Sequence, residues 1–186
     1  MSSKNDSPNL IWVDCEMTGL DLNKDVLVEI AVLVTDSELN ILGEGVDLVI
    51  KASAPQIEGM NDYVREMHTA SGLLTEIPNG VELSEAEAQI ISYLEKYAPG
   101  AGKSPLAGNS VGTDRGFIDR DLPALSAYLH YRTIDVSSIK ELARRWYPRV
   151  YFAAPAKTGN HRALGDIRDS IEELEYYRKA IFIPNN

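Results

Sequence analysis

The hydrophobic pattern of the first fifty residues predicts three strands in succession. Residues 10–16 begin as a continuous apolar run and become acidic, and a segment rich in β-branched residues covers 26–35. Residues 41–50 continue the pattern with Gly43 and Gly45 inside, which is typical of a bent strand or a strand at a sheet edge. The chain is therefore expected to open with an antiparallel meander.

Helical spacing of apolar residues follows this meander. The mixed segment 56–74 predicts short helices. Ser84 and Glu87 have the spacing of a capping box, which predicts the start of a longer helix, and Pro99-Gly100 predicts its end. The expected apolar stripe of this helix consists of Ala88, Ile91, Leu94 and Ala98.

Strands and helices alternate in the remaining half of the chain. We expect a strand at 104–109, a helix at 113–122 and a fifth strand at 132–136. Ser138 is interpreted as the cap of another helix, and apolar spacing from Ala163 onward predicts a long final helix. The helix after Ser138 has the apolar stripe Ile139, Leu142, Ala143 and Trp146. This order predicts an α/β fold in which helices flank a mixed sheet of about five strands.

Composition narrows the possible functions. The chain has 186 residues, of which 44% are hydrophobic and 25% charged, so we expect one folded domain over 1–186 with 1–9 as a loose polar tail. No apolar run approaches the ~18 residues needed to cross a membrane. The net charge of −10 excludes a uniformly basic clamp for long nucleic acid, because such proteins neutralise many phosphates.

Cysteine usage and the first residues indicate the compartment. Cys15 is the single cysteine, which excludes an internal disulfide and a multi-cysteine zinc site. Residues 1–9 carry no apolar targeting segment. A cytoplasmic location is the resulting expectation.

Two acidic residues end the first predicted strand. Asp14 and Glu16 are two positions apart, so their side chains point to the same face, whereas Cys15 points to the other and is expected to face the core. Neighbouring carboxylates repel each other unless water or a cation lies between them. A solvated strand end would also explain this pair when it is taken alone.

Two further segments carry acids at expected helix starts. Asp114 follows a short strand and a glycine turn, and Asp166 follows His161 by five positions at the entry to the final helix. Each acid alone is equally compatible with stabilisation of a helix N-terminus. Together with Asp14 and Glu16, however, they place four carboxylates at strand ends and helix starts, where α/β sheets build their sites.

The four carboxylates suit a pair of divalent metal ions. Their combined charge of about −4 matches the charge of about +4 on two such ions, and hard oxygen ligands favour Mg²⁺ or Mn²⁺. Two metal ions ~3.5–4 Å apart can clamp the attacking and leaving oxygens of a phosphoryl displacement. His161 is then a candidate to take the proton from a metal-bound water.

The motifs D-x-E, N-x-x-x-x-D and H-x-A-x-x-D, in this order, resemble those of the DEDDh 3′→5′ exonucleases, whose fold is ribonuclease H-like. Longer segments are similar to the oligoribonuclease branch of that family. These segments are 11–20 (IWVDCEMTGL), 68–73 (HTASGL), 108–110 (GNS), 131–137 (YRTIDVS) and 140–146 (KELARRW). The resemblance covers about residues 10–180.

The resemblance implies a role for each matching residue. Metal ligation falls to Asp14, Glu16, Asp114 and Asp166, and general-base catalysis to His161. The substrate-binding residues that it implies are Leu20 as a wedge at the terminal base, Tyr63 as an aromatic face, and Ser110, Arg132, Ser137 and His68 around the 5′-phosphate of a very short RNA. It also implies a homodimer, in which Tyr131 comes from the second protomer.

The chain departs from the family pattern at two positions. Tyr63 stands where tryptophan is frequent and offers a smaller stacking surface, and Gly165 stands where an acid is common, just before Asp166. Neither change removes a motif residue. Purely structural roles also explain three of the binding residues. Tyr63 is then a partly buried aromatic residue, His68 a residue at a helix end, and Leu20 a residue that packs within a turn.

The resulting hypothesis is a metal-dependent 3′→5′ exoribonuclease that degrades short RNA oligonucleotides, especially dinucleotides, to nucleoside 5′-monophosphates. Charge supports short substrates independently, because a chain at −10 gains little affinity from a long backbone or a long duplex. One alternative is a DEDDh exonuclease on longer RNA or DNA, for which more Lys and Arg beside the site would be expected. Another is a catalytically silent nucleic-acid-binding domain, which typically loses site carboxylates.

Overall fold

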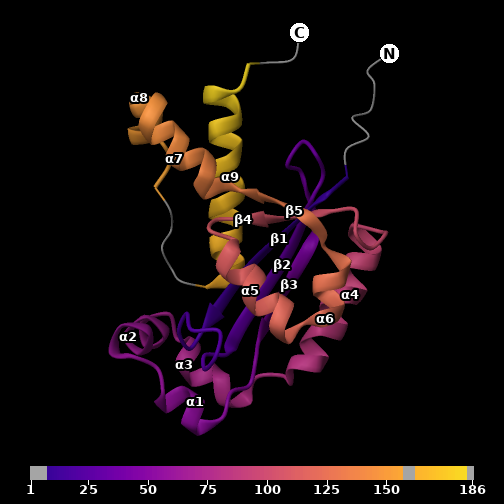
Figure 1. Ribbon diagram of the computed structural model, residues 1–186, viewed down its shortest axis with the longest axis vertical. Helices are drawn as coiled ribbons and strands as arrows, with labels where there is room; N and C mark the ends of the chain where they lie inside the picture. The colour runs from indigo at the N-terminus through magenta and orange to yellow at the C-terminus, as the bar shows by residue number, and fades with distance from the viewer. Residues whose placement is uncertain (1–7, 157–161, 184–186) are drawn as a thin grey trace.

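The computed structural model describes residues 8–156 and 162–183, and its centre is a five-stranded mixed sheet (Figure 1). The strand order is β3-β2-β1-β4-β5, in which β1, β2 and β3 pair antiparallel and β1, β4 and β5 pair parallel. The strands are β1 (Leu10–Met17), β2 (Leu27–Thr35), β3 (Ile41–Val49), β4 (Pro105–Gly108) and β5 (His130–Asp135). The sheet confirms the predicted meander and fold class; the predicted tail, 1–9, lies mostly outside the described residues.

Helices cover both faces of this sheet. They are α1 (Ala54–Glu58), α2 (Asp62–Ala70), α3 (Leu73–Glu76), α4 (Leu83–Tyr97), α5 (Gly112–Asp121), α6 (Pro123–Tyr128), α7 (Val136–Trp146), α8 (Pro148–Phe152) and α9 (Ala163–Ile181), with a 3-10 turn at Ile77–Asn79. In the described part of the chain, no helix is both long enough and apolar enough to cross a bilayer.

The two faces of the sheet form separate cores. Ile11, Val13 and Cys15 of β1 pack against α4, α5 and α6, whereas Trp12 packs against α7 and α9 on the opposite face. All nine residues of β2 are buried, because this strand has neighbours on both edges and helices on both faces. The period-two expectation that Cys15 faces the core is confirmed. Asp14 and Glu16 consequently lie on the face that α9 crosses.

Two predicted helix starts are wrong. The cap of α4 is Glu82, so Ser84 lies inside the helix, and the buried stripe shifts to Ala86, Ile90 and Leu94 while Ala88 is exposed. Glu87 is not part of a capping box; its carboxylate accepts the backbone N–H groups of Ala124 and Leu125 at the start of α6. Ser84 and Glu87 have the spacing of a capping box, but the Glu87 carboxylate instead binds the first turn of α6.

The start of α7 is also earlier than expected. Its cap is Asp135, the last residue of β5, rather than Ser138. Of the predicted stripe only Ala143 is fully buried, and Leu142 and Trp146 are exposed. The apolar face of α7 thus continues onto the molecular surface.

Candidate active site

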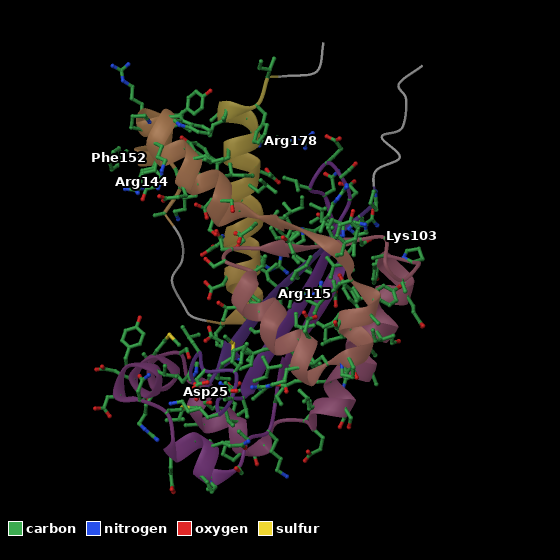
Figure 2. The ribbon with its side chains drawn as sticks, in the orientation of Figure 1. Asp25, Lys103, Arg115, Arg144, Phe152 and Arg178 are labelled. Carbon is green, nitrogen blue, oxygen red and sulfur yellow. The ribbon has the colours of Figure 1, made fainter. Side chains whose placement is uncertain are left out.

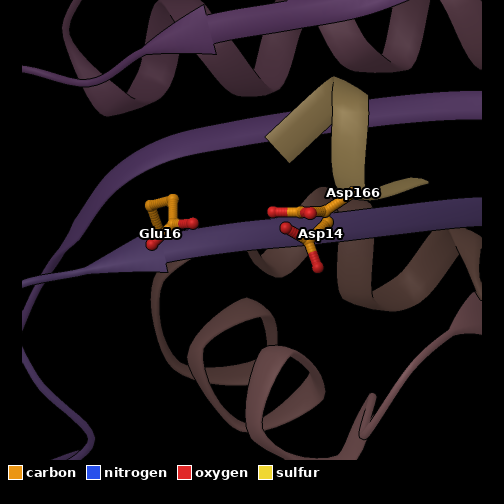
Figure 3. A group of neighbouring side chains, drawn as sticks. All are labelled: Asp14, Glu16 and Asp166. Carbon is orange, nitrogen blue, oxygen red and sulfur yellow. The ribbon is translucent and has the colours of Figure 1, made fainter. Parts of the chain in front are cut away.

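Three of the four predicted metal ligands meet at the end of β1. Asp14 and Glu16 project from the strand, and Asp166 projects from the first turn of α9, as Figure 3 shows. One ligand oxygen of each lies within 4.8 Å of those of the other two. Their convergence follows from the shared parity of Asp14 and Glu16 and from the packing of α9 along that face of the sheet.

The electrostatics of this cluster fit a bound cation. Burial, together with the nearby carboxylates of Glu29, Asp166 and Asp114, raises the pKa of Glu16 to about 8, and Arg162 partly opposes this rise. A positive ion between the carboxylates would relieve this repulsion. The donor set consists of carboxylate oxygens, which are suited to hard divalent metal ions.

Asp114, the fourth predicted ligand, comes from α5, which packs on the face of the sheet opposite to α9. It lies in the first turn of α5 with 6% exposure, and its Oδ1 accepts the backbone N–H of Cys15 at 3.0 Å. Burial raises the pKa of Asp114 to about 6. The hydrogen bond fastens Asp114 to the strand between Asp14 and Glu16, although it does not belong to the three-carboxylate group.

His161, the predicted general base, lies outside the described residues, but the residue after it is firmly held. Arg162 donates from Nε to Oε1 of Glu29 at 2.7 Å, and its two terminal nitrogens contact Glu76 at 3.0 and 3.3 Å. The second oxygen of Glu29 accepts the backbone N–H of Ala163 at 3.0 Å. Glu29 therefore joins β2 to the start of α9, and through it to Asp166.

Glu29 was absent from the predicted site residues, although the sequence carried a signal for it. It is the one charged residue within β2, it is fully buried, and it stands opposite Glu16 in the strand register. A carboxylate inside a continuous apolar strand needs a charged or hydrogen-bonding partner. That partner, Arg162, is 133 positions away in sequence, which is why no local pattern identifies the pair.

Ser110 and Ser137, two predicted phosphate contacts, lie together at the carboxyl ends of β4 and β5. Their Oγ atoms are 3.4 Å apart, and the backbone N–H of Ser110 lies 3.2 Å from Ser137 Oγ. Asp135 Oδ1 accepts from the backbone N–H groups of both serines, at 3.0 and 2.9 Å. Asp135 was not among the predicted site residues.

Tyr131 and Arg132 are displaced outward from the sheet edge by a break in register. Pro105 pairs with His130 and the next residue of β4 pairs with Thr133, so the two residues between them bulge. The Arg132 N–H donates to Nδ1 of His130 at 3.1 Å, and its guanidinium lies 5.4 Å from the Tyr131 ring centroid. The Tyr131 side chain is 76% exposed.

The remaining predicted binding residues occupy two different environments. Leu20 and Tyr63 are each 74% exposed, so both are open to a ligand. His68 is fully buried, with Nε2 2.9 Å from the Met17 carbonyl oxygen and Nδ1 3.9 Å from a carboxylate oxygen of Glu16. Within the described residues, its polar contacts place it beside the acidic cluster rather than beside the two serines.

The turn that carries Leu20 is held by a buried acid. Asp25 accepts hydrogen bonds from the Thr18 hydroxyl at 3.1 Å and from the Asp21 N–H at 2.9 Å, and Figure 2 places it near the end of β1. A Cβ at Gly19 would lie 2.4 Å from an Asp25 oxygen, so glycine is required for this close approach.

Comparisons with known proteins agree with the geometry. Residues 11–174 match the RNase T exonuclease family. The chain is 63% identical to an oligoribonuclease of Streptomyces coelicolor, over 94% of this chain and 88% of that protein. It is 56% identical to an oligoribonuclease of Mycobacterium tuberculosis, over 94% of this chain and 82% of that protein.

Solved exonucleases have a similar fold. The zinc-bound Escherichia coli ExoI–ssDNA complex superposes with a TM-score of 0.73 at 15% identity, and exonuclease I of Methylocaldum szegediense with a TM-score of 0.63 at 20% identity. Each match covers 94% of this chain and 41% of the solved chain. The chain thus spans less than half of those proteins, and at such identity the likeness concerns the fold.

Proposed function

The chain belongs to the oligoribonuclease family of exonucleases, and we propose that this 3′→5′ exoribonuclease acts on short RNA oligonucleotides, down to dinucleotides. Its products are nucleoside 5′-monophosphates. The observation that carries the proposal is the convergence of Asp14, Glu16 and Asp166 within 4.8 Å, with Asp114 hydrogen-bonded to the same strand. The membership and the retained carboxylates argue against a catalytically silent domain.

The acidic cluster is proposed to hold two divalent ions, Mg²⁺ or Mn²⁺. The converging carboxylates of Asp14, Glu16 and Asp166 are the proposed ligands, with Asp114 as the fourth, and carboxylate oxygens are the donors that these metal ions prefer. When bound, the metal ions supply positive charge to the attacking and leaving oxygens of phosphodiester hydrolysis. The imidazole of His161 is proposed to accept the proton of the attacking water.

Substrate length is proposed to be limited at the 5′ end. Leu20 and Tyr63 offer exposed apolar surface to the bases, whereas Ser110, Ser137 and Arg132 are proposed to surround the 5′-phosphate. His68 is buried with its ring nitrogens toward Met17 and Glu16, so it is not included in this set. A dinucleotide with a terminal phosphate then fills the site. A longer RNA must pass a monoanionic phosphodiester through the same contacts, and a chain of net charge −10 attracts the additional backbone weakly.

A homodimer is proposed to complete the site with Tyr131 of the second protomer. The surface around α7 and α8 exposes large apolar side chains, and tyrosine, tryptophan and arginine are frequent at interface centres. Its exposed members are Leu142, Trp146, Tyr147 and Phe152. Figure 2 shows Phe152 and Arg144 on these helices, away from the central sheet. A cytoplasmic location is proposed with this function.

A time course on 5′-labelled RNA of two to seven nucleotides tests the proposal. With Mg²⁺ or Mn²⁺, labelled mononucleotide should form fastest from the 5′-phosphorylated dinucleotide, and excess EDTA should stop the reaction. Arg132→Ala should weaken dinucleotide binding by about 1.5–3 kcal/mol, the scale of a charged hydrogen bond, and narrow the preference over longer RNA. Equal efficiency on two and seven nucleotides would favour an exonuclease of longer strands.

A further inference from the structure

We propose that Asp135 is a positioning residue that holds Ser110 and Ser137 in the geometry required to receive the 5′-phosphate of the substrate. The inference rests on the proposed function, because it takes these two serines as contacts of the terminal phosphate. Asp135 acts through the serines and does not itself touch the substrate.

A single oxygen of Asp135 binds two segments of the chain. Its Oδ1 accepts from the Ser110 N–H at 3.0 Å, the Ser137 N–H at 2.9 Å and the Ser137 hydroxyl at 2.5 Å. Ser110 belongs to the connection between β4 and α5, whereas Ser137 lies in the first turn of α7. The two segments meet because Gly108 and Asp135 are paired at the ends of parallel strands.

The backbone of Ser110 needs this anchor. Its φ angle is +55°, in the left-handed region that is unfavourable for a residue other than glycine. A strained residue persists only when its surroundings hold it. The bond from its N–H to Asp135 at 3.0 Å and the contact of this N–H with Ser137 Oγ at 3.2 Å oppose relaxation of the turn, together with the bond from the Thr113 N–H to the Ser110 carbonyl at 3.3 Å.

The Asp135 carboxylate also competes with a phosphate for the Ser137 hydroxyl proton. Ser137 has one hydroxyl proton, so it can donate to Asp135 or to a phosphate oxygen but not to both. An asparagine would keep an acceptor for the two N–H groups while removing the charge. Substitutions at Asp135 can therefore separate the role of its hydrogen bonds from the role of its charge.

The experiment compares steady-state kcat and KM for a dinucleotide with and without its 5′-phosphate. Asp135→Ser keeps a helix-capping hydroxyl for α7 but is too short to reach Ser110, and it should raise KM about tenfold for the phosphorylated dinucleotide only. For Asp135→Asn, by contrast, KM for the phosphorylated dinucleotide should be at or below the wild-type value. Asp36→Ala is the matched control, because the Asp36 carboxylate also accepts two backbone N–H groups. Asp36 directly follows the last residue of β2, whereas Glu29 lies near the start of that strand. This substitution should leave kcat and KM unchanged for both substrates.

Each result decides the matter. If the wild-type enzyme prefers the phosphorylated dinucleotide and Asp135→Ser leaves that preference unchanged, or raises KM equally for both substrates, Asp135 is not a positioning residue for the phosphate. If Asp135→Asn also raises KM for the phosphorylated dinucleotide, the effect of Asp135→Ser comes from loss of the negative charge and not from loss of the hydrogen bonds. That result would also overturn the inference. If the wild-type enzyme shows no preference for a 5′-phosphate, the proposed function fails at this site and the inference fails with it.

Discussion

The buried carboxylate of Glu29 accepts a hydrogen bond from Arg162 Nε at 2.7 Å, so the residue that follows His161 is fastened to the central sheet. Glu29 is fully buried, and the Arg162 side chain is 28% exposed. The pair therefore differs from the surface ion pairs of this protein, which are screened by solvent.

Removal of Arg162 should destabilise the fold. Arg162→Leu leaves the Glu29 charge buried without its guanidinium partner, which should cost about 3 kcal/mol in the free energy of unfolding. The matched control is Arg178→Leu, which breaks a pair with Glu38 in which both side chains are about half exposed, and should cost less than ~1 kcal/mol. Urea denaturation measures both; similar losses would show that burial of Glu29 adds nothing to the pair.

Asp14→Asn should nearly abolish activity, because it removes a carboxylate charge from the cluster with Glu16 and Asp166. It should also reduce the rise in Tm when Mg²⁺ or Mn²⁺ is added to EDTA-treated protein, since ligand binding stabilises the folded state. Asp36→Asn, at the turn after β2, should retain both properties. An Asp14→Asn protein with wild-type turnover would contradict the metal-site assignment.

The metal-free protein should become less stable as pH rises. The pKa of Glu16 is raised to about 8 by burial and nearby carboxylates, so between about pH 4.5 and 8 the folded state binds more protons than the unfolded state. The stabilisation is complete below the unfolded pKa and is lost as pH passes the folded one. In EDTA, the Tm of wild type should therefore fall relative to the Tm of Glu16→Gln between pH 5 and pH 8. A shift in favour of wild type would oppose the assigned pKa direction.

His161→Ala should separate proton transfer from metal binding. The substitution should lower kcat by a factor of about 10²–10⁴, the usual contribution of a positioned general base, while the metal-induced rise in Tm remains. Activity of the wild-type enzyme should also fall in acid, as the imidazole becomes protonated. Loss of the Tm response in His161→Ala would indicate a role in metal binding instead.

Mixed dimers should reveal whether Tyr131 acts across the interface. Tyr131→Ala and Asp14→Asn proteins should each be impaired, but a heterodimer of the two carries one doubly altered site and one intact site. After subunit exchange at equal concentrations, about a quarter of wild-type activity should return, because about half of the dimers are mixed and each has one working site. No recovery despite measured exchange would place Tyr131 in its own protomer's site.

The sequence by itself determined the strand-borne part of the site. The alternation of side chains along 10–16 was sufficient to put Asp14 and Glu16 on one face and Cys15 on the other, because strand geometry has a period of two wherever the strand is placed. Apolar spacing likewise predicted α9, whose Ile167, Ile171 and Leu174 are buried as expected. These features depend on neighbouring residues alone.

Tertiary structure decided which polar groups meet. The partners of Glu29 and Glu87, and the Ser110 N–H that binds Asp135, are distant in sequence, so the spacing around each acid says nothing about them. Local spacing assigned helix caps to Ser84 and Ser138, and both assignments were wrong, because α4 begins after Glu82 and α7 begins after Asp135. A strand or helix pattern is set by the periodicity of its own backbone, whereas a hydrogen bond between distant segments exists only after the sheet has brought them together.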